Sequence, residues 1–235
     1  MFLARACMAA AGGNAYRNVV LTDKPVAFWP LNETSGTVAA DISGHDFNGT
    51  YTGGITLADI AGIPGAGGNA PVFDGSSGYV TGSQLLTAST INVTLEAWVN
   101  FQGNASPNGG CFFKNGQYNN GYAIGNGGTI MDNAGDNIIG LYEDQSWNPT
   151  TATYPTSGWN HIVMVIGSNS ESTFYLNGAE VATNANSSII APGAQWMIAA
   201  DEGGRLFAGA LSNIAIYNTV LTPARILAHY NAGVA

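Results

Sequence analysis

Residues 94–101 read Thr-Leu-Glu-Ala-Trp-Val-Asn-Phe, and this stretch decides the fold class. Residues two apart share one face of a strand, so its alternating pattern predicts a half-buried β-strand. The opposite face of this strand carries Glu96, Trp98 and Asn100. The residues predicted to face the core are Leu95, Ala97, Val99 and Phe101.

Other stretches also predict strands. Residues 161–166 (HIVMVI) form a short continuous apolar run, which indicates a strand buried on both faces. Residues 173–182 read as a hairpin around Asn177-Gly178, a pair that suits a type I′ turn because both central residues need positive φ. Residues 209–217 predict a further strand. Short strands separated by turn residues, without an internal repeat, are typical of a sandwich or jelly roll.

One short helix is predicted near the C-terminus, over residues 222–233. Thr222 suits the N-cap and Pro223 the first helical position, where a missing N–H costs nothing. The residues expected to pack this helix on the sandwich are Ile226, Leu227 and Tyr230.

The composition excludes several classes of protein. The 235 residues are compatible with one domain. Only 9% of residues are charged and the net charge is −9, so there is no basic patch for nucleic acid. No stretch has the length of a membrane-spanning helix, so membrane insertion is not expected. Cys111 lies between apolar residues and is predicted to be a small core residue, although a disulfide with Cys7 stays open.

The N-terminal segment is predicted to be an arm. Residues 1–13 (MFLARACMAAAGG) contain an apolar run, but Arg5 interrupts it. A secretion signal needs an uninterrupted apolar run of about 7–15 residues. We therefore expect residues 1–17 to be retained as an arm or docking segment, and residues 18–235 to form the folded domain.

Short motifs along the chain resemble one family when they are taken in order. They are PVAFWPLNE (25–33), DISGHDFNG (41–49), FDG (73–75), GYV (78–80), TLEAWV (94–99), GWNHIV (158–163), FYLNG (174–178) and FAGALSNIAIYNTVLT (207–222). Over residues 18–233 the chain resembles laminin-G-like domains of the concanavalin A-like lectin/glucanase superfamily, of the kind found in structural proteins of tailed phages. The resemblance implies an all-β, two-sheet antiparallel jelly-roll sandwich with adjacent N- and C-terminal strands. It implies no single function, because this fold hosts lectins, glycosidases, adhesins and virion proteins.

Catalysis is not expected. Glycosidases on this fold use two carboxylates on one concave strand, about 5–5.5 Å apart in retaining enzymes. Alternate strand residues would supply such a pair, and the chain has no such run. Glu143 and Asp144 are adjacent, so in a strand they would point to opposite faces. The histidines His45, His161 and His229 are scattered without the spacing of a metal site.

The loop of residues 41–49 is a candidate calcium site, because it offers carboxylate, amide, hydroxyl and carbonyl oxygens. The resemblance implies a structural calcium on Asp41 and Asn48. The chain departs from its relatives at residues 211–213 (LSN), where they commonly carry an acidic pair. The alternative is an Asx-rich turn, whose side chains bond their own backbone. No other cofactor is expected.

Sugars bind to aromatic platforms flanked by polar groups, and accessible aromatic residues are expected in loops. The candidate ligand-binding residues are Tyr118, Tyr122, Tyr142, Asp144 and Trp147. Trp196 is a further candidate. Trp29 and Trp98 are predicted to fill the core, and Trp159, which follows a turn glycine, to close the edge of the sandwich. As an alternative, the loop aromatics pack on the sandwich or form a subunit contact.

Three functions follow from these observations. The first is a non-catalytic virion protein of a tailed phage: a head decoration, head fibre or tail-associated protein that stabilises the particle or adheres to host glycans. It would lie on the virion surface as a homo-oligomer and contact other virion proteins through residues 1–17. The second is a secreted carbohydrate-binding module. The third is an architectural protein without a ligand.

Overall fold

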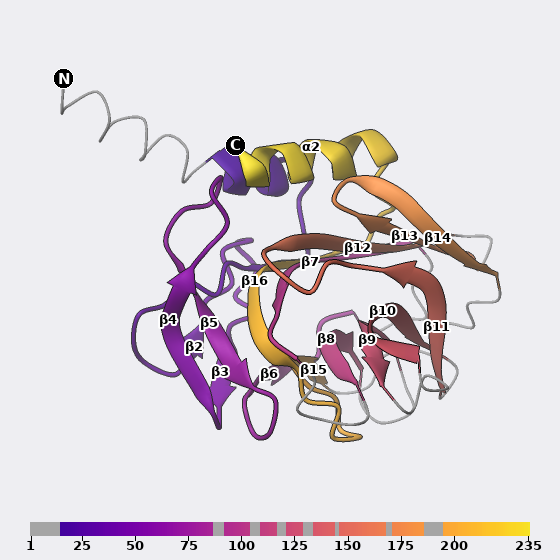
Figure 1. The fold of residues 1–235 in the computed structure, drawn as a ribbon. Coiled ribbons are helices and arrows are strands. Elements are labelled where there is room, and N and C mark those ends of the chain that lie inside the picture. The colour runs from indigo at the N-terminus through magenta and orange to yellow at the C-terminus, as the bar shows by residue number, and fades with distance from the viewer. Residues whose placement is uncertain are drawn as a thin grey trace.

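The computed structural model is a sandwich of two antiparallel sheets, with helices on the outer face of one sheet (Figure 1). It describes residues 15–86, 92–103, 109–116, 121–128, 134–143, 146–167, 171–185 and 195–235. The predicted all-β jelly-roll architecture is confirmed.

Sheet A contains eight strands in the described part of the chain, in the order β14-β13-β12-β7-β16-β5-β4, with β1 paired to β16. The strands are β1 Ala27–Trp29, β4 Ile55–Ala61, β5 Asn69–Asp74, β7 Val93–Phe101, β12 Asn160–Ile166, β13 Glu171–Leu176, β14 Ala179–Ala185 and β16 Ala208–Tyr217. The pairing of β1 with β16 brings the first and last strands together, as the resemblance implied.

Sheet B also contains eight described strands, in the order β11-β10-β9-β8-β15-β6-β3-β2. They are β2 Val38–Ala39, β3 Gly49–Thr52, β6 Tyr79–Ser83, β8 Gly110–Asn115, β9 Tyr122–Gly128, β10 Ala134–Glu143, β11 Ser146–Thr153 and β15 Gln195–Ile198. Cys111 in β8 is a buried free thiol, which confirms its predicted core position.

Strand β7 lies inside sheet A, hydrogen-bonded to β12 on one side and β16 on the other. The four residues that the alternation assigned to the core are all buried between the sheets. Strand β12 is buried along its whole length, as its apolar run predicted. The opposite face of β7 is buried as well, because Glu96 and Trp98 are each only 1% exposed. A second apolar cluster therefore covers this outer face.

The core between the sheets is built around two tryptophans. The rings of Trp29 and Trp196 lie 4.2 Å apart between their centroids, and both residues are fully buried. Gly49 and Gly82 make room for Trp196, because a Cβ atom at either position would lie within 2.5 Å of its ring. The prediction that Trp196 contacts a ligand is therefore wrong. Trp29 packs in this core as predicted, whereas Trp98 is buried on the outer face of sheet A.

The hairpin between β13 and β14 has the predicted turn. Asn177 and Gly178 adopt φ values of 52° and 81°, as a type I′ turn requires. The Asn177 side chain also accepts a hydrogen bond of 2.9 Å from the backbone N–H of His161. The turn residue thus also ties the hairpin to the start of β12.

Helix α2 (Pro223–Val234) lies across the outer face of sheet A (Figure 1). Thr222 caps its first turn by accepting from the Arg225 N–H, as predicted. The buried residues are Ile226, His229 and Gly233, which are spaced three and four apart and so share one helix face. Leu227 is 46% exposed, so its predicted packing role is wrong.

A second helix, over residues 15–22, was not predicted and lies beside α2 (Figure 1). Tyr16 and Val20 of this helix are fully buried in the outer cluster. The boundary predicted after residue 17 therefore cuts through a helix that belongs to the folded domain. No helix in the described part of the chain has the length and apolarity needed to cross a membrane.

Replacing Trp196 by alanine tests its role as a core residue. We expect Trp196→Ala to lower the free energy of unfolding by about 3–5 kcal/mol, because it leaves a large cavity beside Trp29. Urea denaturation followed by circular dichroism measures this loss. Trp159→Ala is the control, since that half-buried ring should cost less. Equal losses for the two variants would contradict the packing described above.

Candidate functional site

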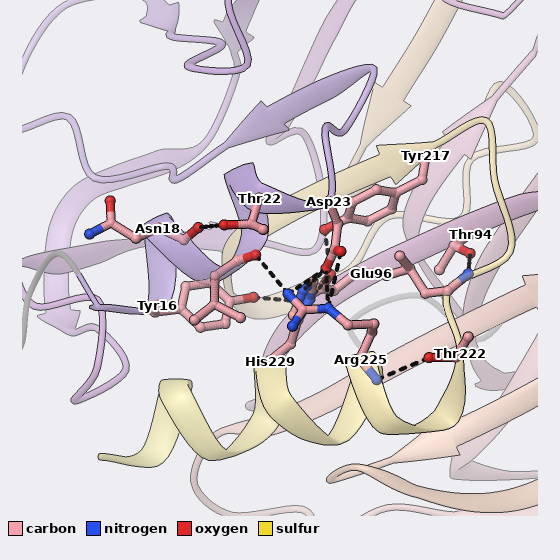
Figure 2. Close-up of polar contacts among 12 residues, drawn as sticks. Tyr16, Asn18, Thr22, Asp23, Thr94, Glu96, Tyr217, Thr222, Arg225 and His229 are labelled. Carbon is pink, nitrogen blue, oxygen red and sulfur yellow. Dashed lines mark hydrogen bonds and ion pairs between the residues drawn. The ribbon is translucent and has the colours of Figure 1, made fainter.

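A buried carboxylate lies at the centre of the described polar contacts. Glu96 of β7 points away from the inter-sheet core, into the space between sheet A and the helices (Figure 2). Its Oε1 atom accepts from the Tyr16 hydroxyl at 2.6 Å, and Oε2 accepts from the Tyr217 hydroxyl at 2.9 Å. Two histidine rings, those of His161 and His229, complete its environment at 2.9 Å each. We call these five residues the Glu96 cluster.

The cluster extends to the N-terminal helix through His229. Its Nε2 atom lies 2.7 Å from Oδ2 of Asp23, which directly follows the helix over residues 15–22. The Arg225 guanidinium binds the same carboxylate, with Nε 3.0 and 2.9 Å from the two oxygens. Arg225 also donates to the carbonyl of Val19 at 3.2 Å. Side chains of α2 thus hold the end of the N-terminal helix on two sides.

The environment keeps Glu96 charged. Burial alone raises the pKa of Glu96, but the charge of His229 and hydrogen bonds from His161 and His229 hold that pKa well below its usual range. Burial lowers the pKa of His229, but the charge of Glu96 and hydrogen bonds to Glu96 and Asp23 raise it on balance. Burial and the charge of Glu96 raise the pKa of the Tyr16 hydroxyl, which therefore stays a donor.

The cluster is suited to fastening the layers together and not to catalysis. Each oxygen of Glu96 accepts hydrogen bonds from groups of this chain, and its side chain is fully buried. The described residues contain no group of three or more His, Cys, Asp or Glu side chains placed to hold a metal ion. The cluster was not predicted from the sequence. A signal was present, because His229 lies three residues after Ile226 and therefore on the same, buried face of the helix.

The structure buries one of the predicted ligand residues and pairs two others across neighbouring strands. Tyr122 begins β9 and is fully buried, and its hydroxyl accepts from Asn115 at 3.0 Å. Its predicted role as an accessible loop aromatic is therefore wrong. Tyr142 and Trp147 lie in β10 and β11, where the backbone register pairs them directly. Tyr118 and Asp144 lie outside the described residues.

The loop of residues 41–49 is organised by hydrogen bonds within the chain. Asp41 Oδ1 accepts from the N–H groups of Phe28 and Ser43, both at 2.9 Å. Its Oδ2 accepts from the Ser43 hydroxyl and the Phe47 N–H, and Asn48 Oδ1 accepts from the Asp41 N–H. This is the geometry of the Asx-rich turn. Calcium on Asp41 and Asn48 stays a prediction.

An open pocket of about 390 Å³ lies at one end of sheet A. It is lined by the last three residues of β5, residues 102–103 after β7, and the first two residues of β16. The carboxylate of Asp74 borders it and accepts five hydrogen bonds from residues 76–78. Burial raises the pKa of Asp74, but those hydrogen bonds together lower it overall. Asp74 therefore shapes the rim of the pocket by holding a turn.

Glu96→Gln tests the energetic weight of the cluster. The variant removes the negative charge beside a buried imidazolium, which typically costs about 3–5 kcal/mol of unfolding free energy. Chemical denaturation of the two proteins measures the loss. Glu180→Gln, which changes an exposed carboxylate, is the matched control and should be close to wild type.

The cluster also predicts how stability depends on pH. Because the pKa of His229 is raised on folding, its contribution is complete below about pH 6.5 and is lost as the pH rises through the folded value. Because the pKa of Glu96 is lowered, its contribution is present above about pH 4.3 and is lost as the pH falls through the folded value. Unfolding measured from pH 3 to 10 should therefore show losses on both sides, and Glu96→Gln should flatten both.

Comparison with known proteins places the chain in a family. A laminin-G-type model, described as the concanavalin A-like lectin/glucanases superfamily, matches residues 74–227. No curated protein matches the chain.

Solved structures share the fold. Domain 4 of AbnA, a GH43 extracellular arabinanase from Geobacillus stearothermophilus, was solved in complex with arabinotriose. It matches with a TM-score of 0.66 and 20% identity, over 88% of this chain and 98% of that chain. The receptor-binding domain of botulinum neurotoxin C/D mosaic serotype matches with a TM-score of 0.66 and 14% identity, over 89% of this chain and 51% of that chain.

The binding domain of botulinum neurotoxin DC, in complex with SialylT, matches with a TM-score of 0.64 and 13% identity, over 90% of this chain and 52% of that chain. The chain therefore spans about half the length of these toxin domains. At these identities, the similarity to the solved structures shows a shared fold only. The family model shows more, because it matches over half of the sequence. The chain belongs to the concanavalin A-like lectin/glucanases superfamily.

Proposed function

We propose that the chain is a non-catalytic, lectin-like module that binds surface glycans and is carried on a larger particle, as a virion protein of a tailed phage. The observation that supports glycan binding is the match to domain 4 of the arabinanase. It extends over 98% of that domain, which was solved with an oligosaccharide. The toxin binding domain solved with SialylT supports the same class of ligand.

Several described acidic side chains make hydrogen bonds within the chain, and this supports a non-catalytic role. Glu33 accepts from the Ala40 N–H and the Tyr51 hydroxyl, which ties β2 to β3. Asp41 and Asp74 hold turns, and Glu96 is buried in its cluster. Asp201 holds the turn to Gly203 and pairs with Arg205. A glycosidase needs a carboxylate pair that is free to contact the sugar, and these five side chains are committed to structure.

The glycan contact is proposed on the β10–β11 hairpin. Its register pairs Tyr142 with Trp147 and Glu143 with Ser146, so two aromatic residues lie opposite each other. Strand β11 is the edge of sheet B, where a ligand can approach from the side. Tyr118 and Asp144, which lie outside the described residues, remain predicted contacts. Loops and strand ends commonly carry binding residues on a rigid scaffold.

The virion role rests on the resemblance of the leading sequence to modules of phage structural proteins. The N-terminal segment, predicted as residues 1–17, would contact other virion proteins. We propose a head decoration, head fibre or tail-associated protein at the virion surface, assembled as a homo-oligomer. A secreted carbohydrate-binding module is the alternative, and its extracellular glycan binding would need no arm.

A glycan array tests the ligand class. We expect the wild-type protein to bind a subset of glycans, and the double variant Tyr142→Ala/Trp147→Ala to lose at least tenfold in affinity because stacking surface is removed. Leu227→Ala is the control, since Leu227 is exposed on α2, over the other sheet. A wild-type array without any bound glycan would contradict the proposal and favour an architectural protein.

Electron microscopy tests the particle role. Intact virions labelled with antibody against the chain should carry copies at regular positions on the head or tail. Recovery of the protein only as a free monomer, with no label on particles, would overturn the virion role and favour the secreted module.

A further inference from the structure

The ring of His229 lies between two carboxylates that belong to different parts of the fold (Figure 2). Its Nδ1 atom is 2.9 Å from Glu96 Oε2, and its Nε2 atom is 2.7 Å from Asp23 Oδ2. An ionised carboxylate only accepts hydrogen bonds, so both ring nitrogens must donate. Only the imidazolium carries two N–H groups. The geometry therefore requires a protonated His229.

His161 differs from His229 in the number of N–H groups that its hydrogen bonds need. Its Nε2 atom faces Glu96 at 2.9 Å, whereas its Nδ1 atom is buried without a hydrogen-bond partner in the described structure. One N–H is enough for this ring, and the neutral tautomer with hydrogen on Nε2 supplies it. The two histidines on Glu96 therefore differ, because only His229 needs its second proton.

The position of His229 makes this proton a link between chain segments. Glu96 lies on β7 inside sheet A, His229 on α2, and Asp23 at the end of the N-terminal helix. We propose that His229 is a proton-dependent clasp: in its doubly protonated form it holds the N-terminal helix on sheet A, and loss of one proton loosens residues 15–24. The segment that precedes residue 15 would then be held less firmly. This inference does not depend on glycan binding.

Charged and titratable groups surround the clasp on every packed element. The N-terminal helix and its end contribute Tyr16 and Asp23, β7 contributes Glu96, β12 contributes His161, β16 contributes Tyr217, and α2 contributes Arg225. Tyr230 of α2 stacks on the His161 ring. After deprotonation, one carboxylate would face a ring lone pair instead of a donor. Glu96 keeps three other donors, so Asp23 is the partner expected to separate.

The pKa of His229 agrees with the direction of this switch. Burial lowers that pKa, but Glu96 and Asp23 raise it overall. The clasp is therefore closed below the folded pKa of His229, while Glu96 and Asp23 are ionised, and opens as the pH rises through that value. Arg225 keeps its own contact with Asp23, so the helix should loosen locally without unfolding the sandwich.

Hydrogen exchange with mass spectrometry on the full chain tests the clasp. Labelling from pH 5.5 to 9.5, corrected for intrinsic exchange, compares peptides covering residues 15–24 with peptides covering β12. We expect protection of residues 15–24 to fall about tenfold per pH unit above the pKa of His229, as one proton requires. Protection of β12 should stay above that of residues 15–24 at every pH and fall only with the global unfolding free energy. His229→Gln should give low, pH-independent protection of residues 15–24.

The chain offers a matched control in His45, which is exposed on the loop of residues 41–49. His45→Gln should retain the wild-type profile. The clasp is overturned if protection of residues 15–24 does not change with pH, or if His229→Gln keeps the pH dependence. It is also overturned if residues 15–24 are as strongly protected as β12 at every pH, which would mean that they open only by global unfolding. Should His229→Gln fail to fold, the wild-type comparison of the two peptides still decides.

Discussion

The burial of Glu96 is the constraint on which the helical layer depends. A carboxylate moved out of water is strongly destabilising unless it is paired and hydrogen-bonded. Here Tyr16, His161, Tyr217 and His229 supply the donors, from the N-terminal helix, β12, β16 and α2. Each donor sits on a different element, so the carboxylate is satisfied only when all of them are in place. Both ends of the described chain are thereby attached to the middle strand of sheet A.

The two faces of sheet A are buried by different kinds of contact. Apolar side chains between the sheets provide most of the burial, with Trp29 and Trp196 in contact at the centre. The outer face of sheet A is closed by helices and carries the ionic cluster. Neither surface is open to a large ligand. The glycan contact is therefore proposed on β11, at the edge of sheet B.

Only 9% of the residues of this chain are charged, and three of its described carboxylates hold turns in their own loops. Asp41, Asp74 and Asp201 each accept from backbone N–H groups a few residues later and so hold a turn. Such Asx-type turns pin the loops where strands change direction. The same short spacing explains why an acidic loop resembles a metal site in the sequence.

The sequence by itself predicted the strands β7, β12, β13, β14 and β16, the inward face of β7, the Asn177-Gly178 turn and the capped C-terminal helix. These features follow from local patterns: a period of two, a turn that needs positive φ, and a cap within three residues of its partner. Only the tertiary structure decided what covers each face. Tyr122 and Trp196 looked accessible but are buried, because strands distant in sequence and two glycines enclose them. Likewise His161 and His229 meet Glu96 across 65 and 133 residues of chain, a separation at which spacing along the sequence carries no information about contact.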